Sequence, residues 1–252
     1  MKDSTKFEVL PLAGFSILSI TASELIKKLN NQLKTEGKTC LLFANTNFVL
    51  QCASLKRWLN SNEVLIVNDG VGLDIAARLL HGHCYQENLN GTDFVPDLLK
   101  NLNTRRKIFL IGGRPGIAEK AATFIEHNLG QQVVGCLNGY SQITQISMLD
   151  EINRSGAEII LVAMGNPLQE EWIHTNMHAL DAKLFIGVGA LFDFLSGNSK
   201  RAPDWVQKIR CEWFYRLIRE PKRLLRRYTA DILIFAFDCI KHRVKFISQI
   251  SK

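Results

Sequence analysis

Short apolar runs alternate with helical patterns from residue 38 to residue 190, and this alternation limits the fold more than any other feature of the sequence. The runs are mostly continuous Val, Ile, Leu and Phe, and they predict strands at Cys40–Ala44, Val64–Val67, Lys107–Ile111, Gln132–Cys136, Ile159–Ala163 and Leu184–Val188. Such runs are typical of strands that are buried on both faces. Helical patterns separate them at Gly70–Leu80, Pro115–Asn128, Thr144–Ser155 and Leu168–Leu180. The sequence therefore predicts an α/β fold, a mostly parallel sheet with helices on both faces.

Charge is divided unevenly between this alternating region and the C-terminal segment. Residues 196–252 contain 14 Lys and Arg against 5 Asp and Glu, whereas the rest of the chain is slightly acidic. The same segment carries the aromatic residues Trp205, Trp213, Phe214, Tyr215, Tyr228, Phe235, Phe237 and Phe246. Helical patterns begin near Pro203 and near Lys222. We therefore expect two domains, an α/β body over residues 1–197 and a basic amphipathic helical appendage over residues 198–252, which suits an anionic surface such as lipid or nucleic acid.

Neither the cysteines nor the histidines are spaced as metal ligands. The six cysteines include no C-x-x-C pair, which favours reduced thiols in a cytosolic protein over a disulfide framework or a zinc site. The pairs His81/His83 and His174/His178 have no suitably spaced Cys or carboxylate to complete a site. No signal-peptide pattern is present, and the longest apolar run, Ile232–Phe237, is far shorter than the ~20 residues of a membrane span. We therefore expect no metal, and a chain that lies on a membrane rather than crossing it.

The residues that follow each predicted strand are the candidates for a site, because ligands bind beyond the carboxyl ends of parallel strands. Asn45-Thr46-Asn47 follows the first strand, and it can either hydrogen-bond a sugar or nucleotide or form a helix N-cap and a turn. Asp69 follows the second strand and precedes Gly70. Its carboxylate can either cap the next helix or act as a general base on an incoming hydroxyl. The residues alone leave both alternatives open.

Two later turns have features of phosphate and nucleotide binding. Gly112 and Gly113 lie between a strand and a helix, where backbone N–H groups of a helix N-terminus can bind a diphosphate. The turn does not match G-x-G-x-x-G, and the next strand ends without an acid for a ribose, which disfavours an NAD-linked enzyme. Gln169 lies in the first turn of a later helix, where it can reach a uracil edge, a ribose or a phosphate. Glu170 and Glu171 beside it are interpreted as favourable partners of the helix dipole.

Several motifs together resemble one family. They are Asn68-Asp69-Gly70-Val71-Gly72, Glu87-Asn88-Leu89-Asn90-Gly91-Thr92-Asp93, Gly112-Gly113-Arg114-Pro115-Gly116, Gly165-Asn166-Pro167-Leu168-Gln169-Glu170, Lys200-Arg201-Ala202-Pro203, Glu212-Trp213-Phe214-Tyr215-Arg216-Leu217 and Glu220-Pro221-Lys222-Arg223. In this order, over roughly residues 40–228, the chain resembles the WecG/TagA/CpsF glycosyltransferases. The resemblance implies a Rossmann-like catalytic body and an appendage that docks on the membrane and completes the active site.

The resemblance also implies an activity and a set of site residues. The activity is an inverting, metal-independent transfer of a hexose from a UDP-sugar to a polyprenyl-diphosphate-linked sugar, with no further cofactor, at the inner face of the cell membrane. Asp69 would be the general base. The implied or candidate substrate-binding residues are Asn45, Asn47, Gly112, Gly113, Gln169, Arg216, Arg223 and Arg226, of which the three arginines would hold a diphosphate.

The branch of the family that the chain resembles indicates the donor sugar, and the family as a whole indicates the partners. The sequence of Glu87–Asp93 is most similar to the exopolysaccharide branch typified by GumM, which implies UDP-glucose as the donor. The alternative within the family is UDP-N-acetylmannosamine or its uronate, and the alternative from another class is a nucleic-acid-binding module, which only the basic aromatic segment supports. We expect a UDP-sugar, a polyprenyl-diphosphate acceptor and an anionic membrane surface as partners, and no nucleic acid. The sequence leaves the oligomeric state open, a homo-oligomer included.

Overall fold

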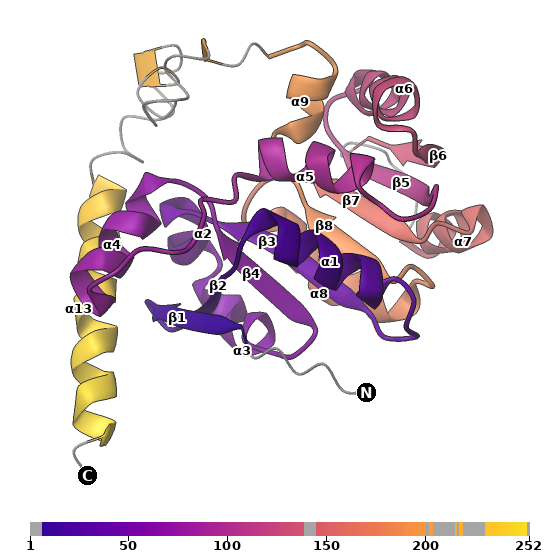
Figure 1. Ribbon diagram of the computed structural model, residues 1–252. Helices are drawn as coiled ribbons and strands as arrows, with labels where there is room; N and C mark the ends of the chain where they lie inside the picture. Colours follow the sequence, from indigo (N-terminus) through magenta and orange to yellow (C-terminus); the bar gives the residue numbers. More distant parts are fainter. Residues whose placement is uncertain are drawn as a thin grey trace.

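The computed structural model describes residues 7–138, 145–199, 202–203, 215, 217–218 and 230–250 (Figure 1). The strands are β1 Glu8–Leu12, β2 Phe15–Ser19, β3 Thr39–Ala44, β4 Val64–Asn68, β5 Lys107–Gly112, β6 Gln132–Leu137, β7 Ile159–Ala163 and β8 Leu184–Gly187. The helices are α1 Ala22–Gln32, α2 Thr46–Gln51, α3 Lys56–Leu59, α4 Val71–His81, α5 Gly91–Lys100, α6 Ile117–Leu129, α7 Gln145–Ser155, α8 Leu168–Asn176, α9 Leu191–Leu195 and α13 Ala230–Ile250, with short 3₁₀ helices at Ala53–Leu55 and Met177–Ala179.

Within the described ranges, all strands belong to one sheet in the order β1-β2-β4-β3-β8-β7-β5-β6. Neighbouring strands are parallel except β1 and β2, which are antiparallel. Each of the strands predicted after residue 38 is confirmed to within one residue at either end. The mostly parallel α/β fold is therefore confirmed.

The β1–β2 hairpin is an element that the sequence analysis did not predict. Its turn is formed by Ala13 and Gly14, whose φ angles are 51° and 84°. Positive φ at both central residues is the geometry of the tight turns that match the twist of antiparallel strands. The register pairs Leu12 with Phe15 across this turn. Since β2 continues in parallel with β4, the hairpin extends the sheet at the end opposite to β6.

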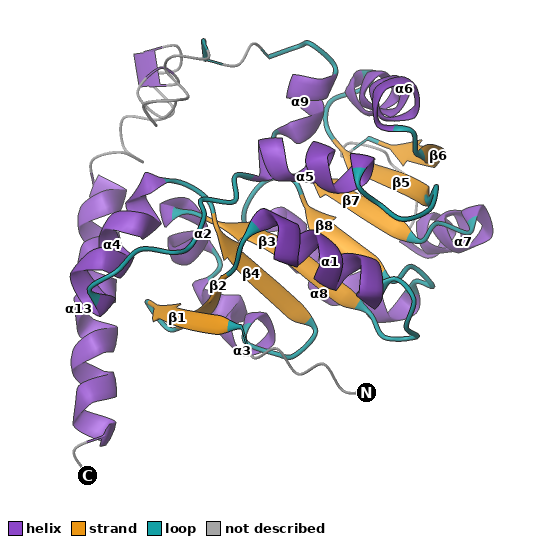
Figure 2. Cartoon of the chain, viewed as in Figure 1, coloured by secondary structure: helices purple, strands orange, loops and turns teal. Residues whose placement is uncertain are grey.

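Both faces of the sheet are covered by helices (Figure 2). Successive residues of β3 alternate between two hydrophobic cores, with Cys40 and Leu42 in one and Leu41 and Phe43 in the other. The first core also contains side chains from α2, α4, α7, α8 and α13. The second contains side chains from α1, α5, α6 and α9. This burial on both faces explains why the strand segments are continuously apolar.

Helix α13 comes from the predicted appendage and packs against α2 and α4 (Figure 1). Phe235 and Cys239 on one side of the helix are buried in the first core. Ile234, Phe237 and Ile240 on its other sides are exposed. The predicted helix from Lys222 towards Ile247 is thus confirmed from Ala230 onwards, and the predicted helix after Pro203 lies largely outside the described residues. The division into domains at residues 197 and 198 stays a prediction.

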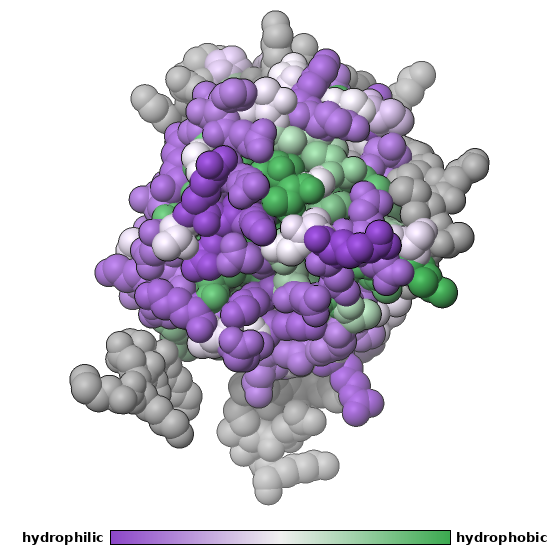
Figure 3. All heavy atoms as spheres, turned by 90° about the vertical axis from the view of Figure 1, so that its right-hand side faces the viewer, coloured by the Kyte–Doolittle hydropathy of each residue, from purple (hydrophilic) through white to green (hydrophobic). Residues whose placement is uncertain are grey.

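The surface of the described region gives two further findings. None of the described helices is sufficiently long and apolar to span a membrane. The face of the molecule at the β6 edge is largely hydrophilic, with an apolar area near its centre (Figure 3). β6 is one of the two edge strands of the described sheet, and its Val133, Val134 and Cys136 are only half-buried.

Candidate active site

The polar residues predicted after the strands lie along one edge of the sheet. β4, β3, β8, β7 and β5 are successive neighbours, and their carboxyl ends point the same way. Backbone hydrogen bonds join the residue after one strand to the last residue of the neighbouring strand. The N–H of Asp69 donates to the Ala44 carbonyl at 2.7 Å, and the N–H of Gly113 donates to the Ala163 carbonyl at 3.1 Å. The segments that follow β4, β3, β8, β7 and β5, which contain Asp69, Asn45, Gly189, Gln169 and Gly113, therefore lie along one rim.

Asp69 lies at the end of β4 and is half-buried. The N-cap of α4 is the next residue, Gly70, whose φ of 104° strongly favours glycine. The N–H of Gly70 donates to Oδ1 of Asn88 at 2.9 Å, which fixes the loop from outside. Asp69 therefore does not occupy the N-cap position of α4, and its role as a base stays a prediction.

The loop between α4 and α5 contains the Glu87–Asp93 motif, and its side chains hold the backbone around this site in place. Glu87 accepts a hydrogen bond from the N–H of Ala22 at 2.7 Å, at the start of α1. Asn88 accepts the N–H of Gly70 as described, and Asn90 is the N-cap of α5. These side chains accept hydrogen bonds from backbone N–H groups of the protein itself, so the structure of the loop explains the motif.

The two asparagines after β3 have different contacts. Asn45 is the N-cap of α2, where its Oδ1 accepts the N–H of Phe48 at 3.1 Å, so the capping interpretation is confirmed for this residue. Asn47 extends across the rim, and its Nδ2 donates to Oδ1 of Asn166 at 3.4 Å. Both asparagines are half-buried. Their binding of substrate stays a prediction.

The glycines after β5 permit close approach of two backbones. Gly112 has a φ of 112°, and a Cβ atom there would collide with the Ala163 carbonyl of β7. Gly113 has a φ of 76°, and its N–H is already used by the same carbonyl. Helix α6 begins only after Gly116, which is exposed. The binding of a diphosphate by this turn stays a prediction, and any free N–H groups for it lie nearer to Gly116 than to Gly112.

Gln169 and Glu170 lie deeper than the sequence indicates. Gln169 is 4% exposed, and its Oε1 accepts the N–H of Gly189, which follows β8, at 3.0 Å. Glu170 is fully buried, and its Oε1 accepts from Nε2 of Gln169 at 2.8 Å and from Nδ2 of Asn166 at 2.7 Å. Burial raises the pKa of Glu170, while its hydrogen bonds to Gln169, Asn166 and the Cys52 thiol oppose the rise. Glu170 is therefore more than a solvated partner of the helix dipole.

The buried position of Glu170 was not predicted, although one signal for it is present in the sequence. Glu170, Ile173 and Met177 are spaced at i, i+3 and i+7, the spacing of one helix face, and all three are buried. A glutamate on the apolar face of a helix is expected to be buried, and a buried carboxylate needs hydrogen-bond donors. Its donors, Asn166 and Gln169, belong to the same turn.

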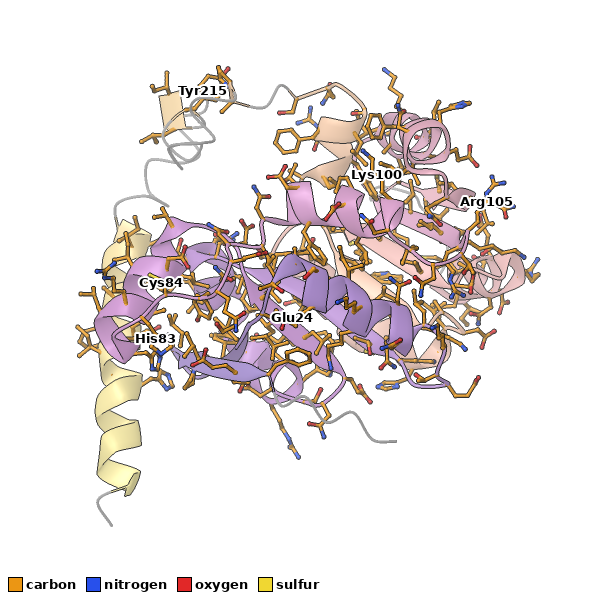
Figure 4. All side chains as sticks on the ribbon, in the orientation of Figure 1. Glu24, His83, Cys84, Lys100, Arg105 and Tyr215 are labelled. Carbon is orange, nitrogen blue, oxygen red and sulfur yellow. The ribbon has the colours of Figure 1, made fainter. Side chains whose placement is uncertain are left out.

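The remaining predicted groups stand as follows. Arg216, Arg223 and Arg226 lie outside the described residues. Tyr215 lies away from the sheet, on the side to which the chain leads after α9 (Figure 4). His83 and Cys84 follow the end of α4 (Figure 4), and Nε2 of His81 lies 2.8 Å from the Pro11 carbonyl oxygen. Among the described residues, no group of three or more His, Cys, Asp and Glu side chains is arranged to hold a metal ion.

Comparison with known proteins gives one family. The model of the glycosyl transferase WecG/TagA/CpsF family matches residues 10–249, nearly the whole chain. A Bacillus subtilis protein named N-acetylglucosaminyldiphosphoundecaprenol N-acetyl-beta-D-mannosaminyltransferase is 34% identical over 168 residues, which cover 66% of this chain and 65% of that relative. The family predicted from the motifs is therefore confirmed. This chain belongs to the WecG/TagA/CpsF family of glycosyl transferases.

Proposed function

We propose that this chain transfers N-acetylmannosamine from a UDP-sugar to a sugar linked to polyprenyl diphosphate. The observation that carries the proposal is the family match over residues 10–249, which includes every described loop of the rim. The name of the Bacillus subtilis relative supports the N-acetylmannosamine alternative more than UDP-glucose. The relative's name also supports a lipid diphosphate as the carrier of the acceptor sugar.

UDP-glucose was assigned as donor from the Glu87–Asp93 segment, and the contacts of this segment weaken that assignment. Glu87, Asn88 and Asn90 are hydrogen-bonded to backbone groups at the starts of α1, α4 and α5. Residues that brace a loop are a poor guide to the donor sugar. We therefore keep UDP-glucose as donor, with exopolysaccharide synthesis as the process, as the less favoured alternative.

In the proposed reaction, the Asp69 carboxylate removes the proton from the acceptor hydroxyl. The hydroxyl oxygen forms a bond to the anomeric carbon from the side opposite to UDP. The bond between that carbon and the UDP oxygen breaks, and its electron pair leaves with UDP, so the configuration is inverted. The end of a buried strand, with the backbone held by Ala44 and Asn88, supports a fixed position for this base.

The departing diphosphate requires positive charge, because negative charge develops on it as the bond breaks. We propose that Arg216, Arg223 and Arg226 supply that charge, and that N–H groups near Gly116 assist. Without a divalent ion, these groups would carry the whole stabilisation of the leaving group. The strongly basic composition of residues 196–252 supports this assignment.

We propose that the appendage binds the inner face of the cell membrane, where a polyprenyl-linked acceptor is presented. The exposed Ile234, Phe237 and Ile240 of α13, within a segment that contains 14 basic residues against 5 acidic ones, suit anionic lipid. Binding of oligonucleotides by the same charges is the competing explanation.

The test is a panel of UDP-sugars with a short-chain polyprenyl-diphosphate N-acetylglucosamine, read as UDP release. We expect UDP-N-acetylmannosamine to be used at least about tenfold faster than UDP-glucose, a difference of ~1.4 kcal/mol in the barrier. Reactions without acceptor are the control for hydrolysis. Faster use of UDP-glucose would overturn the donor assignment. No release from any UDP-sugar, together with salt-sensitive oligonucleotide binding, would overturn the proposed function.

A further inference from the structure

A single buried carboxyl group joins three of the loops that form the rim. Oε1 of Glu170 accepts hydrogen bonds from the side-chain amides of Asn166 and Gln169. Oδ1 of Asn166 accepts in turn from Asn47, in the first turn of α2 after β3. Oε1 of Gln169 accepts from the N–H of Gly189, in the loop after β8. The segments that follow β3, β7 and β8 are thus connected through Glu170.

The chemistry of a carboxyl group decides which way the two amides point. Oε1 of Glu170 accepts hydrogen bonds from both side chains, so the NH₂ ends of both amides must face it. Their carbonyl oxygens are then directed at the groups that donate to them, Asn47 and the N–H of Gly189. With an apolar residue at position 170, either side-chain amide could rotate by about 180°. Asn47 and the N–H of Gly189 would then lose their hydrogen-bond acceptors.

Glu170 is not required merely to fill space. A carboxyl group with no exposed surface is expensive to bury, and here Oε2 has no hydrogen-bond partner among the nitrogen and oxygen atoms of the described residues. An apolar side chain of the same length would pack there without that penalty. The polar group is therefore explained by the orientation it gives its neighbours.

We propose that Glu170 is a positioning residue for the transfer reaction, which acts through Asn166 and Gln169 to hold Asn47 and the Gly189 turn at the substrate rim. The proposal rests on the proposed function for its kinetic consequence, because the rim is the substrate site only if the chain is the transferase described above.

The test compares Glu170→Met with Glu170→Gln. Both side chains match glutamate in length, but only glutamine keeps an oxygen that can accept from both amides. We expect Glu170→Met to raise KM for the UDP-sugar about tenfold with kcat changed less than about threefold, and Glu170→Gln to keep KM within about threefold of the parent.

Two controls separate positioning from a loss of stability. Leu29→Ala removes a buried side chain of α1 from the second core and is expected to lower thermal stability without changing KM. Glu171→Gln changes the exposed neighbour of Glu170 in the same turn and is expected to leave both constants unchanged. Equal KM values for Glu170→Met, Glu170→Gln and Leu29→Ala would overturn the proposal.

Hydrogen exchange gives a readout that does not depend on activity. Positioning predicts that the amide of Gly189 exchanges at least about tenfold faster in Glu170→Met than in Glu170→Gln, because its acceptor is no longer held. Equal protection in the two variants would overturn the proposal. If the parent releases no UDP from any donor but Gly189 exchanges as expected, the proposed function fails and the role of Glu170 in holding the loop stands.

Should Glu170→Met not fold, Asn166→Ala carries the test. Asn166 is only half-buried, and its removal cuts the connection from Glu170 to Asn47 while Gln169 is left in place. A rise in KM of about fivefold or more, with an unchanged melting temperature, would support the proposal. An unchanged KM would overturn it.

Discussion

Replacement of Phe235 by alanine tests whether α13 is part of the folded body, and the helix supplies its own control. Phe235 is 4% exposed and lies in the core formed with α2 and α4, whereas Phe237, two residues later, is 67% exposed. The same substitution at the two positions therefore removes very different amounts of burial. A buried Phe→Ala change destabilises a protein by about 3–5 kcal/mol, and we expect about 3 kcal/mol because α13 lies at the periphery of the core.

For Phe237 only about a third of the side chain is covered, which corresponds to less than about 1 kcal/mol when complete burial contributes roughly 1.5–3 kcal/mol. In urea, with a slope of about 3 kcal/mol per M, the unfolding midpoint should fall by about 1 M for Phe235→Ala and by about 0.3 M or less for Phe237→Ala. Circular dichroism measures both. Equal shifts in the two variants would refute the packing of α13 on the body.

The same pair separates the two roles that we assign to α13. Phe237→Ala should lower partitioning onto anionic vesicles about fivefold, equivalent to roughly 1 kcal/mol, while folded Phe235→Ala protein should bind them like the parent. Loss of vesicle binding in Phe235→Ala alone would contradict the assignment of the exposed face to lipid.

Two further predictions concern the rim. Burial raises the pKa of Glu170 from its usual value near 4.5. Its contribution to stability is therefore complete below about pH 4.5 and is lost as the pH rises through the raised value. The melting temperature of Glu170→Gln should accordingly rise relative to that of the parent as the pH is increased from 4. A difference that is constant with pH, or one that Glu171→Gln reproduces, would contradict this. Gly112→Ala should destabilise the protein by roughly 3 kcal/mol, because a methyl group would meet the Ala163 carbonyl at a φ of 112°, whereas Gly116→Ala, with no atom within 4 Å of the new methyl, should cost only about 1 kcal/mol in denaturant unfolding. Equal losses would show that the contact with β7 is unimportant.

The parallel part of the sheet was predictable because its strands are buried on both sides. Every residue of β3 and of β7 is buried, so continuous apolar runs mark them in the sequence. The β1–β2 hairpin was missed because Pro11, Gly14 and Ser16 interrupt the apolar pattern of this segment. Helix α1 was missed although Thr21 and Glu24 form a capping box, a sign that the sequence offers directly.

The candidate residues of the site were predictable in kind but not in their contacts. Polar residues after parallel strands must reach the same edge, and Asp69, Asn45 and Asn47 do so. Which loops meet depends on the strand order, and β8, the last strand among the described residues, inserts between β3 and β7. That insertion brings Gly189 to Gln169, a contact that local sequence cannot specify. Burial likewise distinguishes Glu170 from Glu171, which are adjacent and chemically identical.

The most direct test of the account is UDP release by Asp69→Asn and by the parent, with the preferred UDP-sugar and acceptor and with EDTA present throughout. The account predicts that the parent is as fast in EDTA as in magnesium or manganese. It predicts that Asp69→Asn is at least about 100-fold slower, with an unchanged melting temperature and unchanged affinity for UDP. A parent that works only with a divalent ion, or an Asp69→Asn variant that keeps near-full activity, would contradict the claim that one carboxylate drives a transfer without metal.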